Sequence, residues 1–199
     1  GKRYIDAIAS WWVNIHGHCH PYLATKISEQ LQRLEHAIFS GFTHEPAVQL
    51  AERLLKRLPS NQSKIFYSDN GSTAVEVALK MAFQYWSNQS IEKVKVIAFE
   101  NAYHGDTFGG MSVGARNAFN MPFSKLLFDV EHIPVPVKGK EMESSTALKR
   151  ALEGNDVGAF IFEPLVQGAG GMVMYSPGIL DELISLCNAK KVLCIADEV

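Results

Sequence analysis

This sequence lacks the features that mark several specialised classes of protein. None of its apolar runs approaches the length of a membrane-spanning helix, and no positively charged segment followed by an apolar one opens the chain. Lysine and arginine are scattered through a chain whose formal net charge is −2, so no basic surface for nucleic acid is predicted. We therefore expect a cytoplasmic protein that binds neither membranes nor nucleic acid.

Cysteine is also scarce. Cys19, Cys187 and Cys194 are an odd number with no CxxC spacing, so neither a disulfide framework nor a zinc knuckle is predicted. A free cysteine behaves as a small apolar residue, and we expect all three to be reduced and buried.

One histidine-rich stretch, "HGHCHP", raises the possibility of a metal site. His16, His18 and His20 alternate, and alternate residues of a strand face the same side. Gly17 and Pro21 argue against a regular strand here, and no second ligand cluster accompanies the histidines. We predict no metal site, while a metal-binding module built on these histidines stays open as a rival interpretation.

The rest of the chain is typical of a globular protein, with 47% hydrophobic and 20% charged residues. Apolar residues at three-and-four spacing predict helices, and short apolar runs predict strands. Helices are expected over residues 21–38, 46–58, 72–86, 147–152 and 177–190, and strands over residues 64–68, 94–99, 158–162 and 192–196. This alternation predicts an α/β fold with a mainly parallel sheet, in which ligands gather at the carboxyl ends of the strands.

The stretch "SDNGSTAVEVALKMA" places a helix start directly after a predicted strand. Gly71 and Ser72 stand there, and free backbone N–H groups, hydroxyls and the positive end of the helix dipole suit a phosphate. Every capped helix shares this chemistry, so an ordinary capped helix is the alternative. No Gly-Lys-Ser/Thr follows a glycine run, which disfavours a nucleoside triphosphate.

Two further residues follow predicted strands. Tyr103, in "NAYHGD", can stack on a flat ring and still use its hydroxyl, although a packed loop tyrosine is the simpler interpretation. Glu163, in "FIFEPLVQGAGG", follows a fully apolar strand. Because a buried carboxylate is costly unless paired, we predict a nearby cation or hydrogen-bonding ligand, with an ordinary salt bridge as the alternative.

The last predicted strand runs into Asp197 in "VLCIADEV". A carboxylate in a low-dielectric pocket at a strand end can keep a heterocyclic nitrogen protonated, because each charge favours the ionised form of the other. Pyridoxal phosphate is a cofactor that needs such a partner, since its protonated pyridine ring acts as the electron sink.

In chain order, the motifs "SWWVNIHGHCHP", "GFTHEPAVQLAERL", "SDNGSTAVEVALKMA", "NAYHGDTFGGMSVG", "IFEPLVQGAGGM" and "IADEV" resemble the class III, pyridoxal-phosphate-dependent aminotransferases of fold type I. The likeness covers essentially the whole chain. It implies a three-layer α/β large domain with a mainly parallel sheet, incomplete in these residues. Residues 1–40 would be a lead-in segment and residues 41–199 the first half of the cofactor-binding large domain, without the C-terminal half and small domain.

The resemblance implies pyridoxal 5'-phosphate as cofactor and a role for each matching residue. The implied cofactor-binding residues are Gly71, Ser72, Tyr103, Glu163, Asp197 and Val199, and the implied substrate-binding residues are Trp11, Tyr103 and Asp106. Gly71 and Ser72 would hold the phosphate, Tyr103 and Val199 would pack on opposite ring faces, and Asp197 would pair with the pyridine nitrogen, with Glu163 nearby. Trp11 would wall the substrate pocket, supported by Asp106.

The family's Schiff-base lysine has no counterpart here, because family members carry it some tens of residues beyond the strand that ends at Asp197. We therefore expect no catalytic residue in these 199 residues, which by themselves should be inactive. The interpretation is that they are the N-terminal half of a longer enzyme.

The paired tryptophans and "QGAGGMVMY" favour family members that convert 8-amino-7-oxononanoate to 7,8-diaminononanoate in biotin biosynthesis. The resemblance further implies S-adenosylmethionine as amino donor, small-molecule substrates that react in turn at one site, and a homodimer. Two alternatives stay open: a class III ω-aminotransferase of the ornithine, acetylornithine or 4-aminobutyrate type, and a non-catalytic chain that only binds the cofactor.

Overall fold

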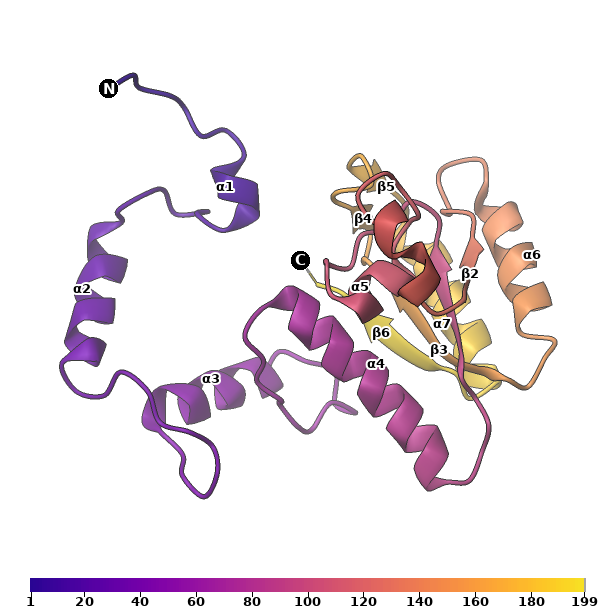
Figure 1. Cartoon of the computed structure of the whole chain (residues 1–199), viewed down its shortest axis with the longest axis horizontal. Helices are drawn as coiled ribbons and strands as arrows, with labels where there is room; N and C mark the ends of the chain where they lie inside the picture. Colours follow the sequence, from indigo (N-terminus) through magenta and orange to yellow (C-terminus); the bar gives the residue numbers. More distant parts are fainter. Residues whose placement is uncertain (199) are drawn as a thin grey trace. The chain divides into compact units, whose positions relative to one another are not determined.

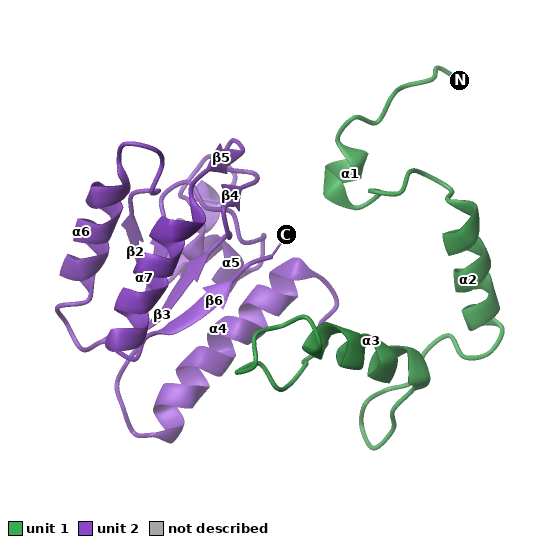
Figure 2. Ribbon diagram, turned by 180° about the vertical axis from the view of Figure 1, so that it is seen from behind, with its two compact units in different colours: residues 1–66 green, residues 67–199 purple. Residues whose placement is uncertain are grey.

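The computed structural model describes residues 1–198. They form two compact units, one of residues 1–66 and one that begins at Tyr67 (Figure 2). The domain boundary that we expect after residue 40 concerns the large domain of a whole aminotransferase, and it stays a prediction.

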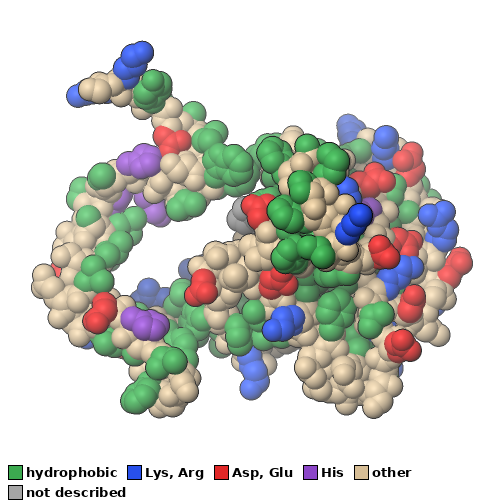
Figure 3. Space-filling model, viewed as in Figure 1, with side chains coloured by type: hydrophobic (Ala, Val, Ile, Leu, Met, Phe, Trp, Pro, Cys, Tyr) green, Lys and Arg blue, Asp and Glu red, His purple; other side chains and the backbone are tan. Residues whose placement is uncertain are grey.

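The first unit consists of helices without a buried core. Its helices are α1 (Ala9–Trp12), α2 (Pro21–Leu31) and α3 (Glu45–Leu55), and none of them contains a buried residue (Figure 1). Proline stands in the first turn of α2 and of α3, where its missing N–H is no loss. Both predicted helices are confirmed, although α2 ends at Leu31 rather than residue 38. Apolar side chains face solvent along this unit (Figure 3). Among them, Ile5 is 95% exposed.

The second unit is built on a parallel sheet with the strand order β2-β1-β3-β6. The strands are β1 (Lys95–Phe99), β2 (Val130–Ile133), β3 (Val157–Phe162) and β6 (Leu193–Ala196). Every residue of the central strand β3 is buried, as expected for a strand covered on both faces. A small antiparallel pair, β4 (Val166–Gln167) and β5 (Val173–Met174), lies in the loop after β3. The predicted α/β class with a mainly parallel sheet is confirmed.

Helices cover both faces of the sheet, which gives three layers (Figure 1). The helices α4 (Gly71–Asn88) and α5 (Phe108–Val113) pack on one face, against side chains such as Val96 and Ile161. The helices α6 (Glu141–Ala151) and α7 (Pro177–Ala189) pack on the other, against Phe99 and Phe160. Neighbouring residues of one strand thus serve opposite cores, because their side chains alternate across the sheet.

Some predicted elements differ from the structure. The strand expected at residues 64–68 is wrong: these residues have no regular structure, because no strand of the described chain pairs with them. The sequence reasoning missed β2, α5 and the 3₁₀ helix η1 (Met121–Leu126). In α5, two of six residues are glycine, which has poor helix propensity.

Two of the expected buried cysteines are exposed. Cys187 is buried on α7, but Cys19 and Cys194 face solvent. Cys19 belongs to the unit without a core, and Cys194 lies on β6, which is the last strand in the sheet order and so has a neighbour on one side. Within residues 1–198, none of the helices combines the length and the apolar character needed to cross a membrane.

Candidate functional site

The loops at the carboxyl ends of three strands meet at one edge of the sheet. Tyr103 and His104 follow β1, Glu163 follows β3 and Asp197 follows β6. The backbone N–H of Tyr103 donates to Glu163 Oε1 at 3.2 Å, and His104 Nδ1 lies 2.8 Å from Asp197 Oδ2. The structure therefore brings together four residues from three segments that are far apart in the sequence, as the parallel sheet predicts.

The amino end of α4 is joined to the same loop. The Thr107 N–H donates to Ser72 Oγ at 3.0 Å, and the Ser72 hydroxyl donates to Thr107 Oγ1 at 2.9 Å. One turn further along α4, Glu76 Oε1 accepts from the Gly109 N–H at 2.6 Å. Gly105 allows this close approach: its φ is +101°, and a Cβ on it would lie 2.3 Å from Ser72 Oγ.

A capping box leaves part of the first turn of α4 open. Asn70 Oδ1 accepts from the Thr73 N–H at 3.0 Å, and Thr73 Oγ1 accepts from the Asn70 N–H at 3.1 Å. Within residues 1–198, the backbone N–H groups of Gly71 and Ser72 have no hydrogen-bond acceptor. A Cβ on Gly71 would meet nothing within 4 Å. Two free N–H groups beside open space, at the positive end of an 18-residue helix, are a donor set that fits a phosphate.

Tyr103 presents its ring at this edge. The side chain is 40% exposed, and its hydroxyl donates to Asp106 Oδ2 at 3.0 Å. Partial burial, followed by the hydrogen bond to Asp106, raises the pKa of the Tyr103 hydroxyl. The hydroxyl therefore stays protonated at neutral pH. Its hydrogen bond to Asp106 leaves the face of the Tyr103 ring available for stacking on a flat ligand.

Asp197 is paired with a histidine that the sequence reasoning left without a role. His104 has no exposed side-chain surface, and that of Asp197 is 15% exposed. His104 Nε2 is buried and lacks a hydrogen-bond partner within the described residues. The signal available in the sequence was the position of His104 directly after Tyr103, in a loop that follows a strand.

Within residues 1–198, no lysine, arginine or histidine side chain forms a salt bridge with Glu163. Its side chain is buried, and its two carboxylate oxygens accept from the backbone N–H groups of Tyr103 and Gly168. Backbone donors thus satisfy the charge, which accounts for a buried carboxylate without a positively charged neighbour.

Trp11 belongs to the other compact unit and lies in an unusual turn. All four residues of α1, Ala9 to Trp12, have φ between 49° and 66°, the left-handed region that non-glycine residues seldom adopt in succession. Asp6 holds this turn: its Oδ2 accepts from the Ser10 hydroxyl at 2.8 Å and lies 2.8 Å from His18 Nε2. Trp11 is 66% exposed, and its substrate-binding role stays a prediction. Val199, the last predicted site residue, lies outside the described residues.

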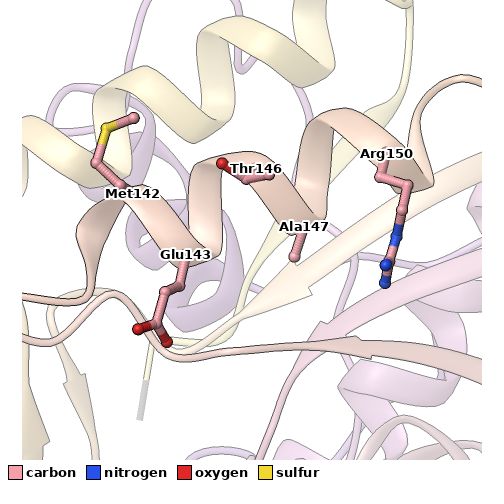
Figure 4. A pocket seen from close by; sticks show the side chains of 5 residues that line it. All are labelled: Met142, Glu143, Thr146, Ala147 and Arg150. Carbon is pink, nitrogen blue, oxygen red and sulfur yellow. The ribbon is translucent and has the colours of Figure 1, made fainter.

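In the described part of the chain, neither a metal site nor the hollow along α6 adds to the candidate site. Within residues 1–198, no three His, Cys, Asp or Glu side chains are arranged to hold a metal ion. A hollow of about 450 Å³ runs along α6 and is lined by Met142, Glu143, Thr146, Ala147 and Arg150 (Figure 4). None of the predicted site residues lines this hollow.

Comparison with known proteins identifies the family. The sequence profile described as "Aminotransferase class-III" matches residues 1–199. The chain belongs to the class-III aminotransferase family. A relative of this class-III chain from Synechococcus elongatus, named adenosylmethionine-8-amino-7-oxononanoate aminotransferase, is 53% identical over 207 residues. That alignment covers 100% of this chain and 49% of the relative, so the chain spans about half the length of the curated relatives it matches.

Solved structures of similar aminotransferases have the same fold. A crystal structure of adenosylmethionine-8-amino-7-oxononanoate aminotransferase from Methanocaldococcus jannaschii matches with a TM-score of 0.92 at 34% identity, over 100% of this chain and 45% of that one. An amine transaminase from an uncultivated Pseudomonas species, described as PLP-bound, matches with a TM-score of 0.91 at 30% identity, over 100% of this chain and 48% of that one. The expected class-III resemblance and fold are both confirmed.

Proposed function

We propose that this class-III chain is part of an aminotransferase that converts 8-amino-7-oxononanoate to 7,8-diaminononanoate in biotin biosynthesis, with pyridoxal 5'-phosphate as cofactor. The amino donor in this proposal is S-adenosylmethionine. The Synechococcus and Methanocaldococcus relatives carry names that combine adenosylmethionine, 8-amino-7-oxononanoate and aminotransferase, and their alignments cover the whole of this chain. The observation that carries the proposal is the meeting of Asp197, Tyr103 and the open end of α4 at one edge of the sheet.

The residues present fit the cofactor. The free N–H groups of Gly71 and Ser72 would hold its phosphate, and the half-exposed ring of Tyr103 would stack on its pyridine ring. Asp197 supplies a carboxylate for the pyridine nitrogen. When bound, pyridoxal phosphate supplies an electron-withdrawing ring that makes a proton on the substrate's α-carbon easier to remove.

The chain's own residues orient the cofactor and hold a proton. Asp197 would keep a proton on the ring nitrogen, and His104 Nδ1, at 2.8 Å, keeps the Asp197 carboxylate in one orientation. The Ser72 hydroxyl is engaged with Thr107, so we propose that Ser72 binds the phosphate chiefly through its N–H. Asp106 would fix the Tyr103 hydroxyl at the substrate side.

Two proposed roles rest on the resemblance alone. Trp11 would form a wall of the substrate pocket, and Val199 would pack on the ring face opposite Tyr103. The amino donor and the amino acceptor would react in turn at the same site. This reaction would need a Schiff-base lysine that is not among these residues.

We also propose that the protein works as a cytoplasmic homodimer on small-molecule substrates. The exposed apolar side chains of α2, namely Tyr22, Leu23, Ile27 and Leu31, support the presence of a further protein surface that covers them. Light scattering coupled to size-exclusion chromatography of the full-length protein would measure its mass in solution, and a monomer at micromolar concentration would contradict the dimer.

The test of the proposed function uses the full-length protein with pyridoxal phosphate. Intact mass is measured before and after borohydride reduction, and we expect a gain of one reduced phosphopyridoxyl group. Amino transfer to 8-amino-7-oxononanoate is then assayed with S-adenosylmethionine as donor. An enzyme that ignores this ketone but aminates pyruvate or 2-oxoglutarate from ornithine would be a different ω-aminotransferase. Absence of any adduct would favour the non-catalytic alternative.

A further inference from the structure

Glu163 is a buried charge that serves two loops at once. Its side chain follows β3, and only 3% of the residue is exposed. Glu163 Oε1 accepts from the Tyr103 N–H at 3.2 Å, and Oε2 accepts from the Gly168 N–H at 2.7 Å. One carboxylate therefore bridges the loop after β1 and the glycine-rich loop of residues 168–171, and each oxygen has a separate partner.

Further contacts join the same two loops. Gln167 has no exposed surface, and its Nε2 donates to the Glu100 carbonyl at 3.0 Å. Gly170 packs so closely that a Cβ on it would lie 2.6 Å from the Asn101 carbonyl oxygen. Gln167 and the glycine-rich loop thus contact residues 100–101, which end two positions before Tyr103.

Tyr175 anchors the far end of the glycine-rich loop. Its hydroxyl donates to the Glu163 carbonyl, and its N–H donates to the Leu165 carbonyl at 3.0 Å. The Tyr175 ring lies 5.6 Å from that of Phe99, between ring centroids, in the core beneath the sheet edge. Burial raises the pKa of the Tyr175 hydroxyl, which therefore remains a donor.

We propose that Glu163 is a positioning residue, whose carboxylate fixes the backbone at Tyr103 and thereby the ring that packs on the cofactor. The proposal rests on the proposed function, in which Tyr103 stacks on pyridoxal phosphate. It differs from the role that the family resemblance implies, a place beside the cofactor, because both Glu163 oxygens are bound to backbone N–H groups of the two loops.

The chemistry of the bridge makes Glu163→Gln an informative change. A glutamine has the same shape, but one of its terminal atoms donates hydrogen bonds, so only one of the two backbone N–H groups can be satisfied. Gly170→Ala is a second variant that separates the loops by a different route, since its new methyl group meets the Asn101 carbonyl. Glu143→Gln, at an exposed position on α6, is the matched control.

The experiment measures residue-resolved hydrogen exchange in the full-length protein, with and without pyridoxal phosphate. For Glu163→Gln we expect exchange at the Tyr103 or Gly168 amide to be faster by roughly tenfold or more, because a hydrogen bond to a charged group is lost. Gly170→Ala should raise exchange in the same two loops, and Glu143→Gln should change neither. Unchanged exchange in both bridge variants would overturn the proposal.

A spectroscopic measurement distinguishes positioning from contact with the cofactor. Glu163→Gln should weaken the circular dichroism of the bound cofactor, which reports its packing on Tyr103, and leave the pH titration of its absorbance unchanged. Asp197→Asn should shift that titration. If Glu163→Gln shifts it as well, Glu163 touches the ring and the proposal is wrong. If the protein binds no pyridoxal phosphate, the proposed function is wrong, and so is the role of Glu163 toward the cofactor. The hydrogen-exchange measurement still decides, independently, whether Glu163 bridges the two loops.

Discussion

His104 Nδ1 and Asp197 Oδ2 lie 2.8 Å apart, although 93 residues separate them in the sequence. The histidine has no exposed side-chain surface, so the pair is shielded from solvent on one side. A carboxylate with a fixed partner keeps one orientation, and this is what the proposed contact with a ring nitrogen requires. The pair leads to the first of four predictions.

Replacing His104 should weaken both stability and the hold on the cofactor. His104→Ala leaves the Asp197 carboxylate without its partner, and we expect the free energy of unfolding to fall by about 1–3 kcal/mol in urea titrations. His104→Asn is the control, because its amide can donate from a position close to Nδ1. The alanine variant should also shift the pH titration of the bound cofactor's absorbance more than the asparagine variant does. Equal behaviour of the two would show that the hydrogen bond to Asp197 does not matter.

Asn70 should contribute through its cap on α4. Asn70→Ala removes the acceptor of the Thr73 N–H, which lies 3.0 Å from Oδ1, and should lower the free energy of unfolding by about 1 kcal/mol. Asn70→Ser retains a side-chain oxygen at the cap and should recover most of the loss. Thermal and urea unfolding of the three proteins measure the difference. If serine is no better than alanine, the cap is not the source of the stability.

Gly105 should tolerate no side chain, for two separable reasons. Its φ of +101° strains any L-residue, and a Cβ would lie 2.3 Å from Ser72 Oγ. Gly139 has a similar φ of +87° with nothing within 4 Å of a Cβ, so Gly139→Ala measures the strain alone. We expect Gly105→Ala to cost about 1–3 kcal/mol more than Gly139→Ala in unfolding experiments, and to weaken the proposed phosphate binding at α4. Equal costs would mean that the loop moves to accept the methyl group.

Asp6 should make the turn of Trp11 and Trp12 sensitive to acid. The backbone N–H of Ser10, and then the hydrogen bonds from the His18 and Ser10 side chains, lower the Asp6 pKa to about 2 from its ordinary 3.8. A carboxyl with a lowered folded-state pKa stabilises the turn above about pH 3.8, and this contribution is lost as the pH falls through about 2.

The tryptophan pair provides the measurement. The rings of Trp11 and Trp12 are 6.4 Å apart at 46°, a geometry that produces near-ultraviolet circular dichroism. Between pH 4 and pH 2 the signal of this pair, identified by difference from Trp11→Phe, should decline. In Asp6→Asn it should be weaker at neutral pH and should no longer depend on acid over this range. Asp69→Asn, at another exposed carboxyl, serves as control. An unchanged acid transition in Asp6→Asn would rule out Asp6 as its origin.

Much of the fold could be predicted because its signals are local. The apolar run of β3 follows from the period of a strand. The helix α4 was predicted from the spacing of Ala74, Val77, Ala78, Met81 and Tyr85, but the face that it buries carries Val75, Leu79, Ala82 and Trp86. The strand expected at residues 64–68 failed because β-structure needs a hydrogen-bonded neighbour, which sequence periodicity does not report. The helix α5 was missed because Gly109 and Gly110 hide it, although they are required there: a Cβ on either would lie less than 3 Å from Glu76 or from the His104 carbonyl.

The sequence by itself determined the α/β class and the ends of the strands at which Tyr103, Glu163 and Asp197 stand, since chain periodicity and strand-to-loop transitions are local properties. Only the tertiary structure decided which atoms meet: His104 with Asp197, and Glu163 with the backbone of two loops. These contacts depend on the register of parallel strands and on the close packing of glycines, which bring together groups that no local pattern relates.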